Sequence, residues 1–326
     1  MPQIILNNIT KKFYVSERPK GRFSALRGAF IRNRREVLAL DNIGFSISEG
    51  ELVGYIGPNG AGKSTTVKVM SGILTPEAGE CKILGRIPWK ERVAHVGQIG
   101  VMFGQRSQLW WDVPVIDSFE LIRDIYKVPG AAYKRSLDEL TALLDLSELL
   151  KTPTRSLSLG QRMRCEIAAS LLHEPKTLFL DEPTIGLDAV SKIAVRQFIR
   201  KLNAERGTTV ILTTHDMQDI EALTQRILLI GKGRILLDGS LAELKKRSSE
   251  RKTLVVEYTG AEPVIGDGMT LVEAKAGRLV IALDPLVVPV SDAIAGLAAQ
   301  TEIADISVTG VTAEEMVAAL YREYRI

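Results

Sequence analysis

Residues 57–65 read Gly-Pro-Asn-Gly-Ala-Gly-Lys-Ser-Thr, and this run constrains the fold more than any other part of the chain. It matches the pattern G-x-x-x-x-G-K-[ST]. A loop that wraps a triphosphate must point several backbone N–H groups inward, which a glycine-rich turn permits without Cβ clashes. In that pattern the lysine contacts the β- and γ-phosphates and the serine hydroxyl binds Mg²⁺. The predicted nucleotide-binding residues are therefore Gly57, Pro58, Asn59, Gly60, Ala61, Gly62, Lys63, Ser64 and Thr65.

The flanking sequence agrees with this prediction. Residues 51–57 form a short apolar run that is typical of a strand, and residues 63–72 predict a helix. The N-terminus of that helix would then face the phosphates, where its unpaired N–H groups favour an anion.

Composition limits the remaining possibilities. A chain of 326 residues is long for one domain and sufficient for two, and 45% hydrophobic and 25% charged residues are ordinary globular values. The two cysteines, Cys81 and Cys165, have no metal-binding spacing, so we expect core positions and a reducing compartment. The N-terminus does not resemble a signal peptide, and no run approaches the roughly 18 apolar residues that span a bilayer. Any work at a membrane would therefore require a partner.

The pattern of apolar residues predicts an α/β fold. Residues 3–14 and 37–48 alternate apolar and polar positions, as half-buried antiparallel strands do, and further strands are expected at 51–57, 80–84, 98–103, 177–180 and 208–213. A helical region is expected from about 112 to 172, with further helices at 189–205 and 216–223. This alternation implies a mainly parallel sheet with helices on both faces.

A domain boundary is expected near residues 240–252, where a short helix would run into a charged linker. We predict a first domain over 1–240, a linker over 241–252 and a small α+β domain over 253–326. The second domain would contain strands at 253–258, 269–274, 278–283 and 303–308, and helices at 289–300 and 312–324.

Polar residues follow the predicted strands in a fixed order. Asp181 and Glu182 end the apolar run that begins at Thr177, and His215 ends the run that begins at Val210. Neighbouring strand residues point to opposite sides, so the two carboxylates need not compete for one ligand. Asp181 is expected to hold Mg²⁺, Glu182 to orient or deprotonate a water for in-line attack, and His215 to stabilise charge on the γ-phosphate. Gln105 ends another predicted strand, where its side chain could reach a nucleotide.

These motifs together closely resemble those of the ATP-binding-cassette (ABC) ATPases. Residues 57–65 resemble the Walker A loop, 178–182 the Walker B strand, Gln105 the Q-loop and His215 the H-loop. Residues 158–161 resemble the signature motif, although Leu159 stands where the family usually has glycine, and Asp188 resembles the D-loop. The resemblance covers about residues 3–240. It implies a P-loop ABC core with a mixed sheet and a helical subdomain at about 112–172. It also implies that Gln105 acts as a sensor and joins Ser64 and Asp181 as a ligand of Mg²⁺.

By the same resemblance, two copies would pair head to tail. Ser158, Gly160, Gln161 and Asp188 of one copy would then complete the nucleotide site of the other. A homodimer with two active sites is possible and a heterodimer remains open. An aromatic residue that stacks on adenine is expected before the basic insertion at 16–36; Phe13 fits best and Tyr14 is the alternative.

Two further signals concern partners. Trp110 and Trp111 would lie either near a membrane subunit or in the core of the helical subdomain. Residues 17–36 hold seven basic and two acidic side chains, and Phe23, Leu26 and Phe30 have helical spacing within them. A basic amphipathic helix at 18–35 would contact anionic lipid or a membrane subunit, whereas the alternatives are a solvated surface hairpin and, least favoured, nucleic acid. No nucleic-acid partner is expected.

The resemblance implies an ATP-hydrolysing subunit, with ATP and Mg²⁺ bound, that drives a separate integral-membrane permease from the cytoplasmic face of the cell membrane. The C-terminal strand, turn and helix, where Thr312 and Glu315 would form a capping box, are similar to the tails of ABC-2-type exporter ATPases. The main alternative is a soluble member of the superfamily that works in translation or DNA repair. A nucleotide sensor without turnover is a third possibility, against which the presence of Glu182 and His215 counts.

Overall fold

The computed structural model describes residues 2–16, 34–104, 107–240, 242–243, 252–310 and 313–324. They form two compact units, Met1–Asp238 and Gly239–Ile326. This division falls two residues before the boundary predicted from sequence. Within the described segments, no helix is both long enough and apolar enough to cross a lipid bilayer.

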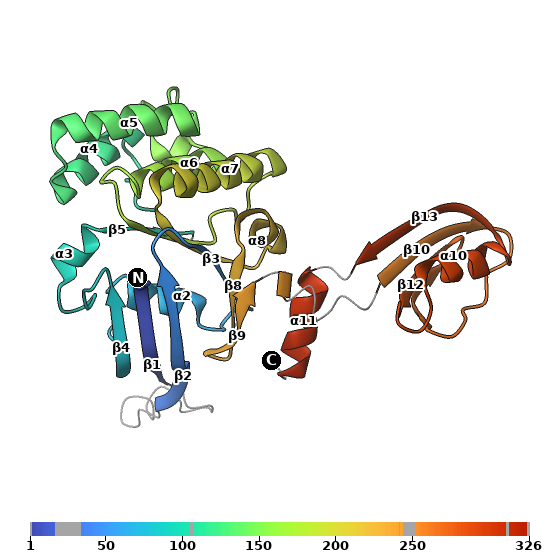
Figure 1. The fold of residues 1–326 in the computed structure, drawn as a ribbon. Helices are drawn as coiled ribbons and strands as arrows, with labels where there is room; N and C mark the ends of the chain where they lie inside the picture. The colour runs from blue at the N-terminus through green and yellow to red at the C-terminus, as the bar shows by residue number, and fades with distance from the viewer. Residues whose placement is uncertain are drawn as a thin grey trace, which may run out of the picture. The chain divides into compact units, whose positions relative to one another are not determined.

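A six-stranded sheet forms the centre of the first unit (Figure 1). Its strand order is β5-β6-β7-β3-β8-β9, and the neighbours from β5 to β8 run parallel. β6 and β7 are buried along their whole length, as expected for parallel strands that are covered on both faces. The six strands are β3 (Leu52–Ile56), β5 (Ile99–Phe103), β6 (Thr177–Asp181), β7 (Thr209–Thr214), β8 (Arg226–Gly231) and β9 (Arg234–Ser240).

A second, antiparallel sheet has the order β2-β1-β4. It comprises β1 (Pro2–Ser16), β2 (Arg34–Ser48) and β4 (Ala78–Ile83). Ile4 and Ile43 from this sheet share one hydrophobic core with Tyr55 and Phe179 from the first sheet. The two sheets therefore supply the parallel and antiparallel pairs of the predicted mixed α/β core. Cys81 and Cys165 are free thiols and fully buried, as expected.

Helices surround these sheets, and α4, α5 and α6 gather above the six-stranded sheet in Figure 1. α5 packs on α6 and α7, α2 packs on β6, and α8 packs on β3 and β7. The helical region predicted at about 112–172 is confirmed. The helices of the first unit are α2 (Lys63–Met70), α3 (Arg92–Val96), α4 (Val115–Tyr126), α5 (Gly130–Leu144), α6 (Leu159–Ala169), α7 (Ala189–Arg206) and α8 (Met217–Leu223), with a 3₁₀ turn at Thr154–Ser156.

The second unit has a four-stranded antiparallel sheet of order β11-β12-β10-β13. Alternate residues of β10 and β12, such as Leu254 and Ile281, form its core with Ala293 and Leu297 of α10. The predicted α+β composition is confirmed. The elements are β10 (Lys252–Thr259), β11 (Met269–Lys275), β12 (Arg278–Leu283), β13 (Glu302–Gly310), α10 (Val290–Ala298) and α11 (Ala313–Glu323).

Candidate nucleotide site at the carboxyl edge of the sheet

The glycine-rich loop connects β3 to α2, as predicted. Lys63 is the first residue of α2 and is only 6% exposed. Its Nζ donates hydrogen bonds to the carbonyl oxygens of Gly57 at 2.6 Å and Pro58 at 3.3 Å. Burial lowers the pKa of Lys63, while the negative charges of Glu182 and Asp181 oppose this shift. The loop thus holds one cation in place at the start of a helix.

The loop glycines are required for different reasons. A Cβ at Gly57 would lie 2.6 Å from the carbonyl oxygen of Ile230 in β8. Gly62 has φ +114°, and a Cβ there would lie 2.9 Å from the carbonyl oxygen of Ala39. Gly60 also has positive φ, but a Cβ there would meet nothing within 4 Å. The loop therefore packs closely against Ile230 and Ala39 near Gly57 and Gly62, whereas the space around Gly60 is open.

A cavity of about 690 Å³ lies beside this loop, at the edge where the parallel strands end. Phe103 and Gly104 border it after β5, Asp181 and Glu182 after β6, and His215 after β7. The phosphate-loop residues that line it are Pro58, Asn59, Gly60, Gly62, Lys63, Ser64 and Thr65. The structure thus brings most of the predicted phosphate loop together with three side chains predicted from distant sequence.

Asp181 and Glu182 both line this cavity, which differs from the expectation that they point to opposite sides. β6 ends at Asp181, and Glu182 adopts the left-handed conformation with φ +55°, so strand alternation does not extend to it. Its backbone N–H donates to the carbonyl oxygen of Thr213 at 2.9 Å. The Thr213 hydroxyl also donates a hydrogen bond to the Asp181 carboxylate. Thr213, which the sequence pattern did not single out, therefore orients both acidic residues.

His215 lies immediately after β7, with its side chain 57% exposed. Its Nδ1 is 3.3 Å from Oε1 of Glu182. The histidine and the candidate base therefore lie in direct contact and both line the cavity, which is compatible with action on the same phosphate.

The residues that resemble the signature motif lie elsewhere in the chain. Ser158 caps α6: its hydroxyl accepts from the Gln161 N–H at 3.2 Å, and Oε1 of Gln161 accepts from the Ser158 N–H at 2.9 Å. Gly160 approaches α7 so closely that a Cβ would lie 2.8 Å from the Ser191 hydroxyl. None of these three is among the described residues that line the cavity. One chain therefore does not bring them to its own phosphate loop.

Asp188 also serves as a helix cap. Its carboxylate accepts hydrogen bonds from the N–H and the hydroxyl of Ser191, both at 2.9 Å, at the start of α7. These bonds lower the pKa of the Asp188 carboxyl. Ser191 thus hydrogen-bonds to Asp188 and lies close to Gly160, so it connects the D-loop-like segment to the signature-like segment.

The two candidate adenine-stacking residues lie on β1. Phe13 pairs with Val37, which is two residues from the cavity-lining Ala39 along β2, whereas Tyr14 pairs with Glu36. Among the described residues that border the cavity, neither aromatic appears. Gln105 and most of the basic insertion, residues 17–33, lie outside the described residues, as does Thr312.

Trp110 and Trp111 are 46% and 53% exposed, which excludes the alternative that they form the core of the helical subdomain. The guanidinium of Arg162 lies 5.6 Å from the centre of the Trp111 ring. Trp111 also borders a small cavity of about 220 Å³ with Arg162 and Glu166 of α6. The tryptophans are therefore available to a partner.

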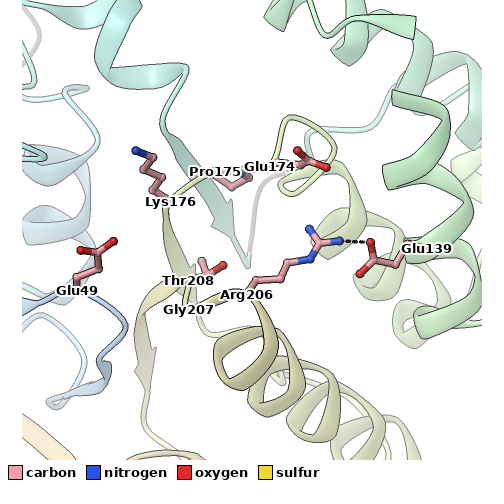
Figure 2. A pocket seen from close by; sticks show the side chains of 8 residues that line it. All are labelled: Glu49, Glu139, Glu174, Pro175, Lys176, Arg206, Gly207 and Thr208. Carbon is pink, nitrogen blue, oxygen red and sulfur yellow. Dashed lines mark ion pairs between the residues drawn. The ribbon is translucent and has the colours of Figure 1, made fainter. Parts of the chain in front are cut away.

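A different cavity, of about 470 Å³, lies where the same strands begin (Figure 2). Glu49, Glu139 and Glu174 line it together with Lys176 and Arg206, and Arg206 forms an ion pair with Glu139 at 2.5 Å. α7 ends at this cavity with Arg206 and Gly207, so the cavity faces the negative end of a helix. It therefore lacks the amide-rich cradle that a triphosphate requires.

Comparison with known proteins agrees with the site geometry. The family model described as "ABC transporter" matches residues 40–185. The daunorubicin resistance ATP-binding protein DrrA3 of Streptomyces coeruleorubidus is 34% identical over 250 residues, which cover 76% of this chain and 73% of that protein. The chain belongs to the ATP-binding proteins of ABC transporters.

Two other relatives of this ABC protein are similar over about two thirds of its length. The uncharacterized ABC transporter ATP-binding protein YhcH of Bacillus subtilis is 33% identical over 205 residues, covering 63% of this chain and 66% of YhcH. The probable multidrug ABC transporter ATP-binding protein YbhF of Escherichia coli is 35% identical over 213 residues, covering 65% of this chain and 36% of YbhF. The chain therefore spans less than two thirds of the length of either relative.

A solved structure confirms the fold of this ABC protein. The dimeric, post-hydrolysis ATP-binding cassette MJ0796, bound to ADP and Pi, aligns with a TM-score of 0.60 and 26% sequence identity. The alignment covers 73% of this chain and 98% of that one. The P-loop ABC ATPase core expected from the sequence is thereby confirmed.

Proposed function

We propose that this chain binds and hydrolyses MgATP and, with a second ATPase subunit, powers transport through separate integral-membrane permease subunits. The observation that carries the proposal is the convergence of Lys63, Asp181, Glu182 and His215 on one cavity beside the phosphate loop. A cation, two carboxylates and a histidine around a triphosphate site are the groups needed to bind the nucleotide and to activate a water.

The phosphates would be held by the loop amides and by Lys63. The ammonium of Lys63 already bridges two loop carbonyls, so its position is set before the ligand arrives. The open apex at Gly60 leaves room for phosphate oxygens. The N-terminal end of α2 adds a favourable dipole for the negative charge.

The residues present fit a magnesium ion. Ser64 and Asp181 offer hydroxyl and carboxylate oxygens at the cavity, and oxygen donors are what this hard cation prefers. In the described parts of the chain, no three His, Cys, Asp or Glu side chains form a set that could hold a metal alone. This agrees with a site in which phosphates and waters complete the coordination. When bound, Mg²⁺ would offset charge on the phosphates; Gln105 is proposed as a further ligand and sensor.

Hydrolysis would depend on Glu182 and His215. Glu182 accepts or orients the proton of an attacking water, and its contact with His215 restricts where its carboxylate can point. His215 then donates a hydrogen bond to the γ-phosphate as charge develops there. Near-contact of the two side chains supports a shared role on one phosphate.

We further propose a head-to-tail pair in which Ser158, Gly160, Gln161 and Asp188 of one copy face the nucleotide of the other. Their location away from the chain's own cavity supports this, because such a site is incomplete without a second subunit. The similar cassette MJ0796 is itself dimeric, which is consistent with this pairing. The two copies are proposed to be identical. Phe13 is proposed as the adenine platform in preference to Tyr14, since it forms an apolar pair with Val37 near the cavity wall.

Export is the proposed direction of transport. The names of DrrA3 and YbhF refer to drug resistance and multidrug transport. The exposed Trp110 and Trp111 are proposed to face the permease, and residues 18–35 to contact that subunit or anionic lipid at the cytoplasmic face of the membrane.

The test of this proposal combines two measurements on the full chain. Phosphate release from MgATP should be saturable, and immobilised protein should capture a polytopic membrane protein from detergent-solubilised membranes. Replacement of Arg32, Arg34 and Arg35 by alanine should weaken that capture without changing nucleotide binding. Capture of ribosomal or DNA-repair proteins in place of a permease would contradict the transport assignment.

A further inference from the structure

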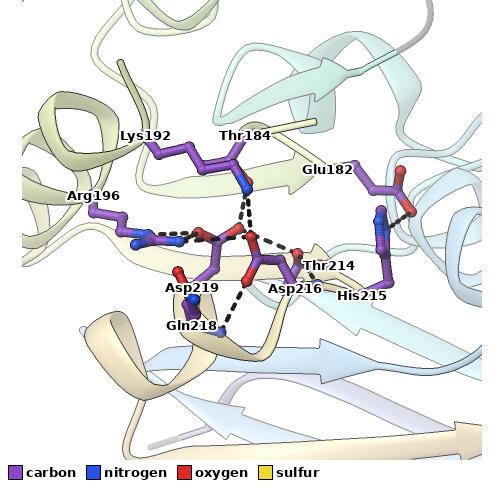
Figure 3. A network of polar contacts seen from close by, with 9 residues as sticks. All are labelled: Glu182, Thr184, Lys192, Arg196, Thr214, His215, Asp216, Gln218 and Asp219. Carbon is purple, nitrogen blue, oxygen red and sulfur yellow. Dashed lines mark hydrogen bonds and ion pairs between the residues drawn. The ribbon is translucent and has the colours of Figure 1, made fainter. Parts of the chain in front are cut away.

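A buried carboxylate lies at the centre of a polar network beside the proposed catalytic residues (Figure 3). Asp219, in α8, is 0% exposed. It accepts hydrogen bonds from Nε of Arg196 at 2.6 Å, from the hydroxyl of Thr214 at 3.2 Å and from the hydroxyl of Thr184. These three donors come from α7, from the end of β7 and from the turn that follows β6. One side chain thus joins three segments that are separate in sequence.

Each donor lies close in sequence to a residue with a proposed role. Thr184 is two residues after Glu182, and Thr214 immediately precedes His215. Arg196 lies about two turns into α7, the helix that Asp188 caps. Asp219 is therefore connected to the candidate base, to the candidate phosphate-binding histidine and to the D-loop-like segment. It is not among the described residues that line the nucleotide cavity.

The residue after His215 is held by the same network. Asp216 accepts a hydrogen bond from Nζ of Lys192 at 2.6 Å and lies 3.7 Å from Nη2 of Arg196. Its own N–H donates to the Thr214 hydroxyl at 2.9 Å. Both sequence neighbours of His215 are thus fixed to α7 and α8, while the ring itself is largely exposed and contacts Glu182 at 3.3 Å. The position of the ring must therefore be set mainly through its backbone.

Stability alone does not explain why the ion pair between Arg196 and Asp219 is buried. Desolvation of two charges is expensive, and apolar residues of similar size often give equal or greater stability at the same place. A charged network is therefore more informative as a positioning device, because it fixes relative geometry where apolar packing would tolerate sliding.

We propose that Asp219 is a positioning residue for hydrolysis: with Arg196 it fixes the Thr184 and Thr214 segments and so sets the separation of Glu182 and His215. The inference rests on the proposed function of the cavity. It predicts that loss of the network slows the chemical step and leaves nucleotide binding nearly unchanged, because the phosphate loop is not part of it.

The test measures kcat, KM and the dissociation constant for MgATP in full-length variants. Asp219→Asn keeps the size and one acceptor oxygen but loses the charge opposite Arg196. We expect kcat to fall about 10–100-fold, since a misplacement of about 1 Å can cost about 100-fold. KM and the dissociation constant should stay within about twofold.

A double-mutant cycle and a control variant separate positioning from folding. Arg196→Gln should resemble Asp219→Asn, and the double variant should fall little further, because the pair acts as one unit. Asp238→Asn removes a carboxylate that holds Arg226 through two hydrogen bonds, at 2.8 and 2.9 Å, outside the network. It should leave kcat unchanged and, because this pair is partly exposed, should lower thermal stability less than the loss of the buried pair does.

The inference is overturned if Asp219→Asn retains the wild-type kcat, or if kcat and affinity fall in step with the folded fraction. Should that variant fail to fold, Thr184→Val decides: it removes one hydroxyl donor and should lower kcat several-fold at constant affinity, and an unchanged kcat would count against the inference. An inactive wild-type chain would instead refute the proposed function.

Discussion

The two edges of the six-stranded sheet carry cavities that differ in how they present charge. At the carboxyl edge, a buried lysine, a glycine-rich loop and the positive end of α2 face two carboxylates. At the amino edge, five charged side chains face solvent around the negative end of α7, and two of them neutralise each other. The size of a cavity alone does not identify a nucleotide site. The distinguishing feature here is that the positive end of α2 and the buried Lys63 face the same cavity.

The largest expected effect is on hydrolysis at the carboxyl edge. Glu182→Gln should lower kcat about 10²–10⁴-fold, since a positioned general base contributes about that much. The dissociation constant for MgATP should stay within a few-fold, because the phosphate loop is untouched. The measurement is phosphate release alongside equilibrium binding.

Glu174→Gln, the same chemical change at the amino edge, is the matched control and should leave kcat unchanged. Near-normal turnover in Glu182→Gln, or a comparable loss in Glu174→Gln, would mean that the two edges do not differ as proposed.

A second comparison uses glycines. Gly57→Ala would force a Cβ to within 2.6 Å of the Ile230 carbonyl oxygen. Overpacking of this kind costs about 1–3 kcal/mol, so the loop should shift and MgATP should bind about tenfold more weakly or worse, as about 1.4 kcal/mol corresponds to tenfold.

Gly207→Ala at the amino edge tests the opposite case. Gly207 has φ +63° and open space around its Cβ position, so alanine should cost about 1–2 kcal/mol of stability through backbone strain. Calorimetric titration should then show wild-type affinity. Weak binding in Gly207→Ala, with wild-type binding in Gly57→Ala, would reverse the assignment of the two cavities.

The smallest expected effect concerns the ion pair between Arg206 and Glu139. Both side chains are partly exposed, and exposed pairs contribute about 0–1 kcal/mol. Glu139→Gln should therefore change the free energy of unfolding by less than about 1 kcal/mol, measured by denaturant titration. Hydrolysis should be unchanged, and a clear loss would show that the amino edge takes part in turnover.

Local sequence patterns predicted most of the fold. The phosphate loop follows a fixed glycine-rich motif, and the strands β5, β6 and β7 and the four strands of the second unit carry apolar runs bounded by turns. β8 and β9 are absent from the predicted strands, although Gly231 and Gly233 mark a turn between two apolar runs in the sequence.

Other features depend on contacts between distant residues and leave no local pattern. Thr184 and Asp219 are 35 residues apart and meet only because β6, β7 and α8 pack together. The left-handed backbone of Glu182 likewise follows from the sheet around it, and strand alternation gave the wrong orientation there. The proposed roles of Ser158 and Gly160 involve contacts with a second copy, which no pattern within a single chain encodes locally.

Calorimetric titration of MgATP into three full-length proteins tests the central claim most directly. The wild type and Lys176→Ala should bind with the same affinity, because Lys176 lies at the amino edge. Lys63→Ala should lose most of that affinity, because it removes the buried ammonium of the phosphate loop. Wild-type binding by Lys63→Ala, or loss of binding in Lys176→Ala alone, would contradict the account.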